Sequence, residues 1–79
     1  MKLVDTNLCL WLLHEIKVTK LQMELLEQIY DASPDTRNEN LSIDLRLRII
    51  KFKEENLGQR IVLTDKLIAL NKELAGVLP

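Results

Sequence analysis

Hydrophobic residues recur at helical spacing in three stretches of the chain. The last stretch is the most regular, with steps of four, three, four and three residues between Leu63, Leu67, Leu70, Leu74 and Val77. This spacing is typical of a helix that packs along another helix. Gly76 is placed to end it, so a helix is predicted from about Arg60 or Thr64 to Ala75. A weaker second stripe comprises Ile61, Ile68 and Ala75.

The first stretch predicts one long helix. Residues 1–33 contain no glycine or proline, and the side chain of Asp5 or Thr6 can accept a hydrogen bond from a free backbone N–H at a helix start. We expect a helix from about Thr6 to Asp31. Its apolar arc is wider than the ~100° that one packing face requires. The helix is therefore expected to have neighbours on two sides.

The middle stretch carries two competing periodicities. A loop is predicted over residues 32–40, which combine a proline with short polar side chains. Residues 41–49 then alternate between apolar and polar, as in a half-buried strand. A helical template also fits, with one stripe at Ile43, Leu47, Ile50 and Leu57 and an opposite one at Leu41, Leu45, Ile49 and Phe52. A single strand with at most one short partner is a marginal sheet. We therefore predict a helix from Leu41 or Ser42 to Asn56, with Gly58 just past its end.

These elements predict an all-α fold, a small bundle of three helices in a single domain over residues 1–79. At 1.5 Å per residue, the two shorter helices would cover only the later half of the long one. The uncovered part would present an apolar patch that is expected to bind a partner. A second copy of the chain is the favoured partner, because a homodimer would complete the bundle. The predicted partner-binding residues are Leu8, Trp11, Leu12 and Ile16.

Composition limits the environment and the partners. The chain has 79 residues, near the size at which one hydrophobic core gives only a few kcal/mol of net stability. Eleven basic and twelve acidic side chains give a net charge of −1, which provides no overall attraction for nucleic acid or anionic lipid. Cys9 is the only cysteine, which fits a reducing cytosol. The longest apolar run, residues 8–13, is too short to cross a membrane. A cytoplasmic location is expected.

The sequence offers no catalytic, cofactor-binding or metal-binding constellation. His14 is the only histidine, and on a helix it projects about 140° away from Cys9. A zinc site needs three or four ligands on one face, so we interpret both residues as structural. The glycines, Gly58 and Gly76, lie at expected helix ends and form no phosphate-binding loop. The chain is therefore expected not to be an enzyme and to need no cofactor.

Four cations within eight residues suggest an alternative function, which is DNA binding. Arg46, Arg48, Lys51 and Lys53 could contact DNA in a transcriptional regulator, but on a helix they would spread around the axis. The favoured function is therefore a small helical protein-interaction module. It would act as a dimeric adaptor, inhibitor or chaperone-like regulator through apolar helix faces.

Overall fold

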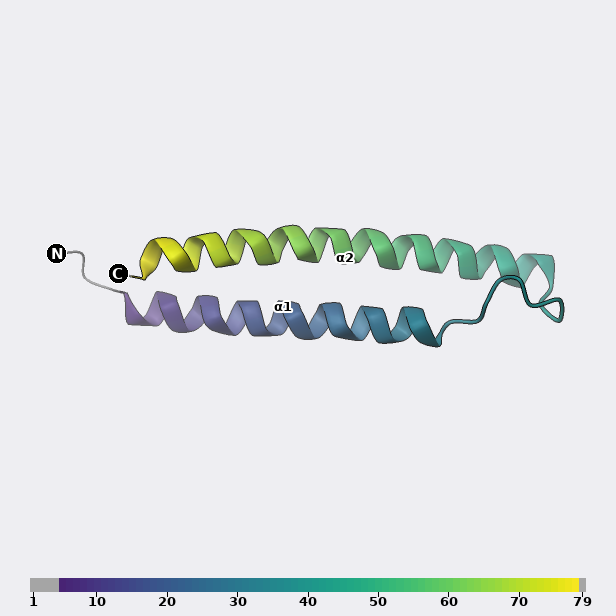
Figure 1. Cartoon of the computed structure of the whole chain (residues 1–79), viewed down its shortest axis with the longest axis horizontal. Coiled ribbons are helices and arrows are strands. Elements are labelled where there is room, and N and C mark those ends of the chain that lie inside the picture. The colour runs from purple at the N-terminus through teal and green to yellow at the C-terminus, as the bar shows by residue number, and fades with distance from the viewer. Residues whose placement is uncertain (1–4, 79) are drawn as a thin grey trace.

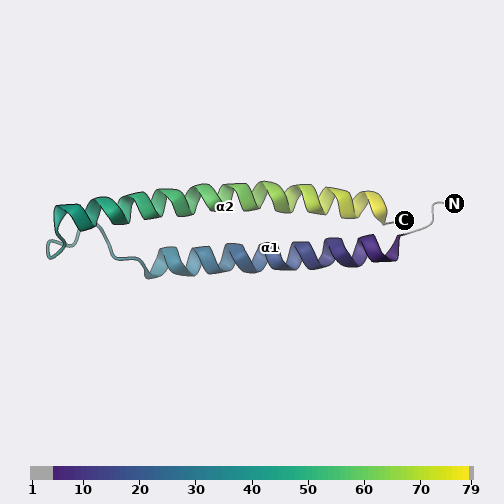
Figure 2. The same cartoon turned by 180° about the vertical axis from the view of Figure 1, so that it is seen from behind.

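The computed structural model describes residues 5–78, which form two α-helices joined by one loop. Helix α1 spans Thr6–Ala32 and helix α2 spans Ile43–Val77. The helices run side by side in opposite directions, with the start of α1 next to the end of α2 and the loop at the far end (Figure 1), and the view from behind shows the same arrangement (Figure 2). The molecule measures 65 × 15 × 13 Å. It is an extended helical hairpin.

The predicted bundle of three helices is wrong, because α2 continues for 35 residues through Gly58. A glycine inside a helix costs only about 1 kcal/mol relative to alanine, and Gly58 does not adopt the left-handed conformation that ends helices. Less exposed residues of α2 recur every seven residues before and after Gly58, at Ile49, Asn56, Leu63 and Leu70. One continuous packing surface therefore outweighs the local cost of the glycine.

The helix starts follow from side-chain caps, as expected. The Asp5 side chain accepts a hydrogen bond from the backbone N–H of Leu8 at 3.1 Å, and the Ser42 hydroxyl accepts one from Leu45 at 3.2 Å. The all-α prediction is confirmed, and the strand alternative for residues 41–49 is wrong, because nearly all of this segment lies in α2. Proline 34 follows the end of α1 and belongs to the loop.

The helices meet along a seam that repeats at steps of three and four residues. We call it the inner seam. Its α1 positions are Cys9, Leu12, Ile16, Thr19, Met23, Leu26 and Tyr30, and its α2 positions are Arg46, Ile49, Lys53, Asn56, Arg60, Leu63, Leu67, Leu70, Leu74 and Val77. Alternating steps of three and four are the geometry of coiled coils. The hairpin is therefore an intramolecular antiparallel coiled coil.

The two halves of the inner seam differ in chemistry. Near the start of α1, Leu12, Ile16 and Leu70 form the buried apolar cluster, with Leu67, Leu74 and Val77 packed against it. Toward the loop the seam mixes apolar residues such as Ile49 with polar and charged ones. There the Asn56 side-chain amide donates to the Leu26 carbonyl at 2.8 Å, and Lys53 and Arg60 lie over the Tyr30 ring at 5.4 and 5.0 Å from its centroid. These directional contacts fix the register of α1 against α2.

Candidate interaction surfaces

The structure separates the four residues of the predicted partner-binding patch. Leu12 and Ile16 are 0% and 7% exposed and belong to the inner seam. Leu8 and Trp11 remain exposed, Trp11 at 53%. The reason given for the patch does not hold, because the long α2 covers α1 to its first turns. Partner binding by Leu8 and Trp11 stays a prediction, whereas Leu12 and Ile16 are already covered by the chain itself.

A second apolar stripe runs along α2 outside the seam. We call it the outer stripe, and its side chains are between 42% and 76% exposed: Ile43, Leu47, Ile50, Leu57, Ile61 and Ile68. The steps between them are four, three, seven, four and seven residues, so they share one face of the helix. The sequence showed the two halves of this stripe as separate features. The continuous α2 joins them into one surface.

A groove lies between the helices on one side of the hairpin, and we call it the mid-length groove. It has a volume of about 820 Å³ and is lined by Gln22, Leu25, Leu26 and Ile29 of α1 and by Glu55, Gly58, Gln59, Val62 and Leu63 of α2. A Cβ atom added at Gly58 would meet nothing within 4 Å. The glycine therefore has no close neighbour in the hairpin that requires its small size.

A smaller hollow continues the groove toward the loop. It is lined by Leu26, Ile29, Phe52, Glu55, Asn56 and Gln59. Asn56 is only 3% exposed, and its side-chain oxygen has no hydrogen-bond partner. A buried polar atom without a partner is costly. The described part of the hairpin therefore encloses one acceptor without satisfying it.

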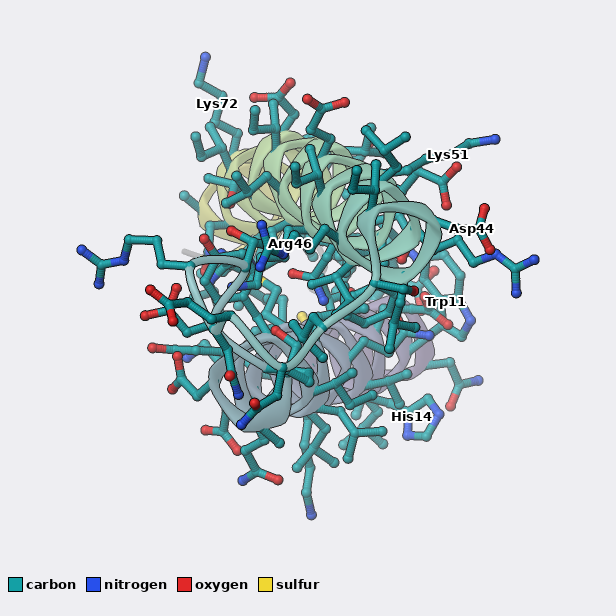
Figure 3. The ribbon with its side chains drawn as sticks, turned by 90° about the vertical axis from the view of Figure 1, so that its right-hand side faces the viewer. Trp11, His14, Asp44, Arg46, Lys51 and Lys72 are labelled. Atoms are coloured by element: carbon teal, nitrogen blue, oxygen red, sulfur yellow. The ribbon has the colours of Figure 1, made fainter. Side chains whose placement is uncertain are left out.

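The inner seam, the groove and the outer stripe occupy three different faces of α2. At 100° per residue, the three sets of positions are roughly 120° apart around the helix. Viewed from the loop end, Trp11 and Lys51 point to one side of the hairpin and Arg46 to the other (Figure 3). The first side carries the groove, and the outer stripe lies on the second. The hairpin therefore exposes two separate apolar surfaces on opposite sides.

The four basic residues of the predicted DNA contact do not share a face. Arg46 donates to the Asn38 carbonyl in the loop at 2.9 Å, Arg48 pairs with Asp44 at 3.3 Å, and Lys53 lies over Tyr30. Lys51 and Arg46 point to opposite sides of the hairpin (Figure 3). Three of these cations are thus engaged within the chain. Their arrangement does not form the continuous basic stripe that tracks a phosphate backbone.

The loop contains one strongly perturbed acid. The Arg37 side chain hydrogen-bonds both Asp35 carboxylate oxygens, and its Nη2 is 3.0 Å from Oδ2. The backbone N–H of Arg37 also donates to this carboxylate at 2.9 Å. These hydrogen bonds lower the pKa of Asp35 from 3.8 to about 2, the side-chain bond contributing most. The pair organises the loop and lies away from both apolar surfaces.

His14 and Cys9 occupy different settings. Cys9 is a buried free cysteine in the inner seam, whereas His14 is exposed. Within residues 5–78 no three His, Cys, Asp or Glu side chains are grouped to hold a metal ion. Neither α1 nor α2 is long and apolar enough to span a membrane.

Sequence reasoning missed the groove and the polar residues of the inner seam. Both depend on the continuity of α2, which places Asn56 and Arg60 at seam positions. The usable signal was the unbroken three-four spacing from Arg46 to Val77, which runs through Gly58. No protein-family model matches the chain, and neither a curated protein nor a solved structure matches it.

Proposed function

We propose that the chain is a helical protein-interaction module, an adaptor, inhibitor or chaperone-like regulator, that binds a helix of another protein along the outer stripe. The observation that carries this proposal is the exposure of six large aliphatic side chains in heptad register on one face of α2. Contiguous apolar surface of this kind is expensive to leave in water and marks interaction sites. A helix with matching spacing is the occupant that such a stripe fits.

The packing of the inner seam supports a separate role for the outer stripe. It already satisfies the packing of α2 against α1, through Leu67, Leu70, Leu74 and their contacts. The outer stripe is therefore not needed to hold the hairpin together. Its position on a long, straight element also gives a rigid binding surface, which lowers the entropic cost of association.

The test compares two double variants that change the net charge equally. Ile50→Lys with Ile61→Lys places two cations on the outer stripe, and Glu24→Gln with Glu27→Gln changes the charge by the same amount on the polar arc of α1. Each tagged full-length chain is purified from the cells that produce it, and co-purifying proteins are quantified by mass spectrometry. Proteins that the wild type and the control retain but the stripe variant loses are the candidate partners.

A candidate partner is then purified and titrated against each chain by calorimetry. The stripe variant should bind at least about 100-fold more weakly than the wild type, because each unpaired buried charge is strongly unfavourable. The control should bind within about threefold. Equal binding by all three chains would refute the proposal.

The same preparations test the DNA alternative. A labelled DNA duplex is titrated at several salt concentrations, because phosphate contacts give a steep loss of affinity with salt. We expect weak binding that does not change when Arg48 and Lys51 are replaced by Gln. Tight binding with a steep salt slope that is lost in this variant would favour a DNA-binding regulator instead.

A further inference from the structure

We propose that the mid-length groove is a homodimer interface, in which a second copy of the chain packs its α2 antiparallel to α2 about a two-fold axis. Val62 of each copy then lies over Gly58 of the other. This inference names a partner for the face opposite the outer stripe, so it goes beyond the proposed function and can fail or succeed independently of it.

The accessible surface of the hairpin is larger than that of a compact chain of the same mass. The chain exposes 6411 Å², whereas a compact monomer of its mass exposes about 4,900 Å². A compact dimer of twice the mass would expose roughly 8,200 Å², so about 4,600 Å² would be buried in total. That area lies in the range of obligate homodimers. A second hairpin is therefore a partner of the right size to turn two layers of helix into a four-helix bundle.

The position of the groove favours a symmetric occupant. Helix α2 spans residues 43–77, so its middle is residue 60, and Gly58 and Val62 flank this position inside the groove. An axis that passes between them lets two copies of α2 overlap over their full length. It also brings the exposed Val62 of one copy to the open space at Gly58 of the other. Small residues allow the close approach of two helices.

The chemistry of the groove is self-complementary. Its apolar side chains, including Leu25 and Ile29, would be covered by the same residues of the second copy. Gln22 and Gln59 line the groove, and their side-chain amides both donate and accept hydrogen bonds, so each can pair with a glutamine of the second copy.

A small molecule fits this groove less well than a helix. Binding sites for small molecules bury most of the ligand surface, but only two helices form the walls here, so the outer side of a ligand would stay in water. A second helix pair supplies the missing walls and extends along the hairpin. The apolar side chains of the groove would then become a core.

The test measures the mass of the full chain by sedimentation equilibrium at micromolar concentration. The wild type should sediment at twice its 9.2 kDa mass. Gly58→Leu should raise the dimer dissociation constant at least about 100-fold, because the new side chain overpacks the interface twice, once from each copy. The hairpin itself should keep its helical circular dichroism, since nothing lies within 4 Å of the added Cβ.

Ala75→Leu is the control. Ala75 is exposed and lies seven residues after Ile68, so it continues the outer stripe on the face of α2 away from the groove. This substitution should leave the dissociation constant within about threefold. A monomeric wild type would overturn the proposal and leave the groove to a helix of another protein. Equal effects of the two substitutions would overturn it as well.

Spin labels test the antiparallel arrangement directly. In a Cys9→Ala background, labels are placed at Thr64→Cys or at Asn71→Cys, which share a face of α2 away from the groove. With the axis at residue 60, the two labels of a dimer are offset along the helix by about 12 Å at position 64 and about 33 Å at position 71. The distance measured at position 71 should therefore be clearly longer. Similar distances at both sites would indicate a parallel dimer and refute the proposed axis.

Discussion

At the scale of one residue, Leu12 shows that a sequence does not distinguish burial within the chain from burial against a partner. Its apolar character and helical position predict burial, and it is 0% exposed. The sequence does not say which helix covers it. The prediction assigned it to another chain because α2 was expected to be interrupted, whereas the structure packs it near Leu70 of the same chain. Burial was thus predictable from residue type, but the identity of the neighbour depended on the length of another element.

Replacing Leu12 with Ala should destabilise the hairpin by about 2–5 kcal/mol, because the lost side chain leaves a cavity in the small apolar cluster. Leu10→Ala is the control, since Leu10 is largely exposed and its truncation should change the free energy of unfolding by less than about 0.5 kcal/mol. Urea unfolding at one fixed protein concentration measures both. Similar losses for the two variants would contradict the assignment of Leu12 to the inner seam.

Asp35 gives a pH-dependent prediction. Its pKa falls from 3.8 to about 2 because of the hydrogen bonds from Arg37. The ionised form is thus favoured by folding, so this contribution to stability is fully present above pH 3.8 and is lost as the pH falls through about 2. An NMR titration of the Asp35 carboxyl carbon should give a midpoint near pH 2.

Arg37→Gln provides the comparison for this titration. Without the guanidinium, the Asp35 midpoint should move back toward 3.8. An unchanged midpoint in the variant would show that another group holds the pKa down.

At the scale of elements, the sequence predicted α1 almost to its ends but misjudged α2. Asp5 and the polar loop bound α1 with local chemistry. Gly58 was expected to end a helix, because glycine often does so. The signal that outweighed it is not local, since the seam positions on either side of Gly58 must both face α1. The groove and the outer stripe were unpredictable for the same reason, because each spans the position where the helix was thought to break.

The continuity of α2 can be tested by a proline in its middle. Ile61 is exposed, so Ile61→Pro changes the backbone without disturbing the inner seam. It should cost ~3 kcal/mol or more, because proline removes a helical hydrogen bond and clashes with the preceding turn. Thermal unfolding followed by circular dichroism measures the loss, with Ile61→Ala as the control. A small effect of the proline would indicate two separate helices on either side of Gly58.

At the scale of the whole molecule, the hairpin is much longer than it is thick. Its radius of gyration is 18.5 Å, whereas a compact domain of 79 residues has about 11.6 Å. A layer of only two helices buries few side chains. The few buried apolar side chains give little stability. The sequence predicted a partner from the short chain and from an uncovered part of α1, and this partner stays a prediction.

Thermal stability should therefore depend on protein concentration. If two folded hairpins associate, the folded state gains stability from the dimer, and dilution removes this gain by mass action. A hundredfold dilution from about 100 μM should lower the unfolding midpoint by several degrees, as measured by circular dichroism. An isolated hairpin would unfold at the same temperature at every concentration.

The unequal halves of the inner seam have a consequence for motion. The half near the start of α1 contains the buried cluster of Leu12, Ile16 and Leu70. Among the described residues, the half near the loop has one buried aliphatic side chain, Ile49, beside Asn56 and the cations over Tyr30. Local opening is easiest where few apolar contacts are lost. The two helices should therefore separate first at the loop end, while the cluster of Leu12, Ile16 and Leu70 stays packed. Hydrogen exchange should show faster amide exchange in residues 43–56 than in residues 63–74. At the loop end, the spacing between α1 and α2 can thus change when another molecule packs against the hairpin.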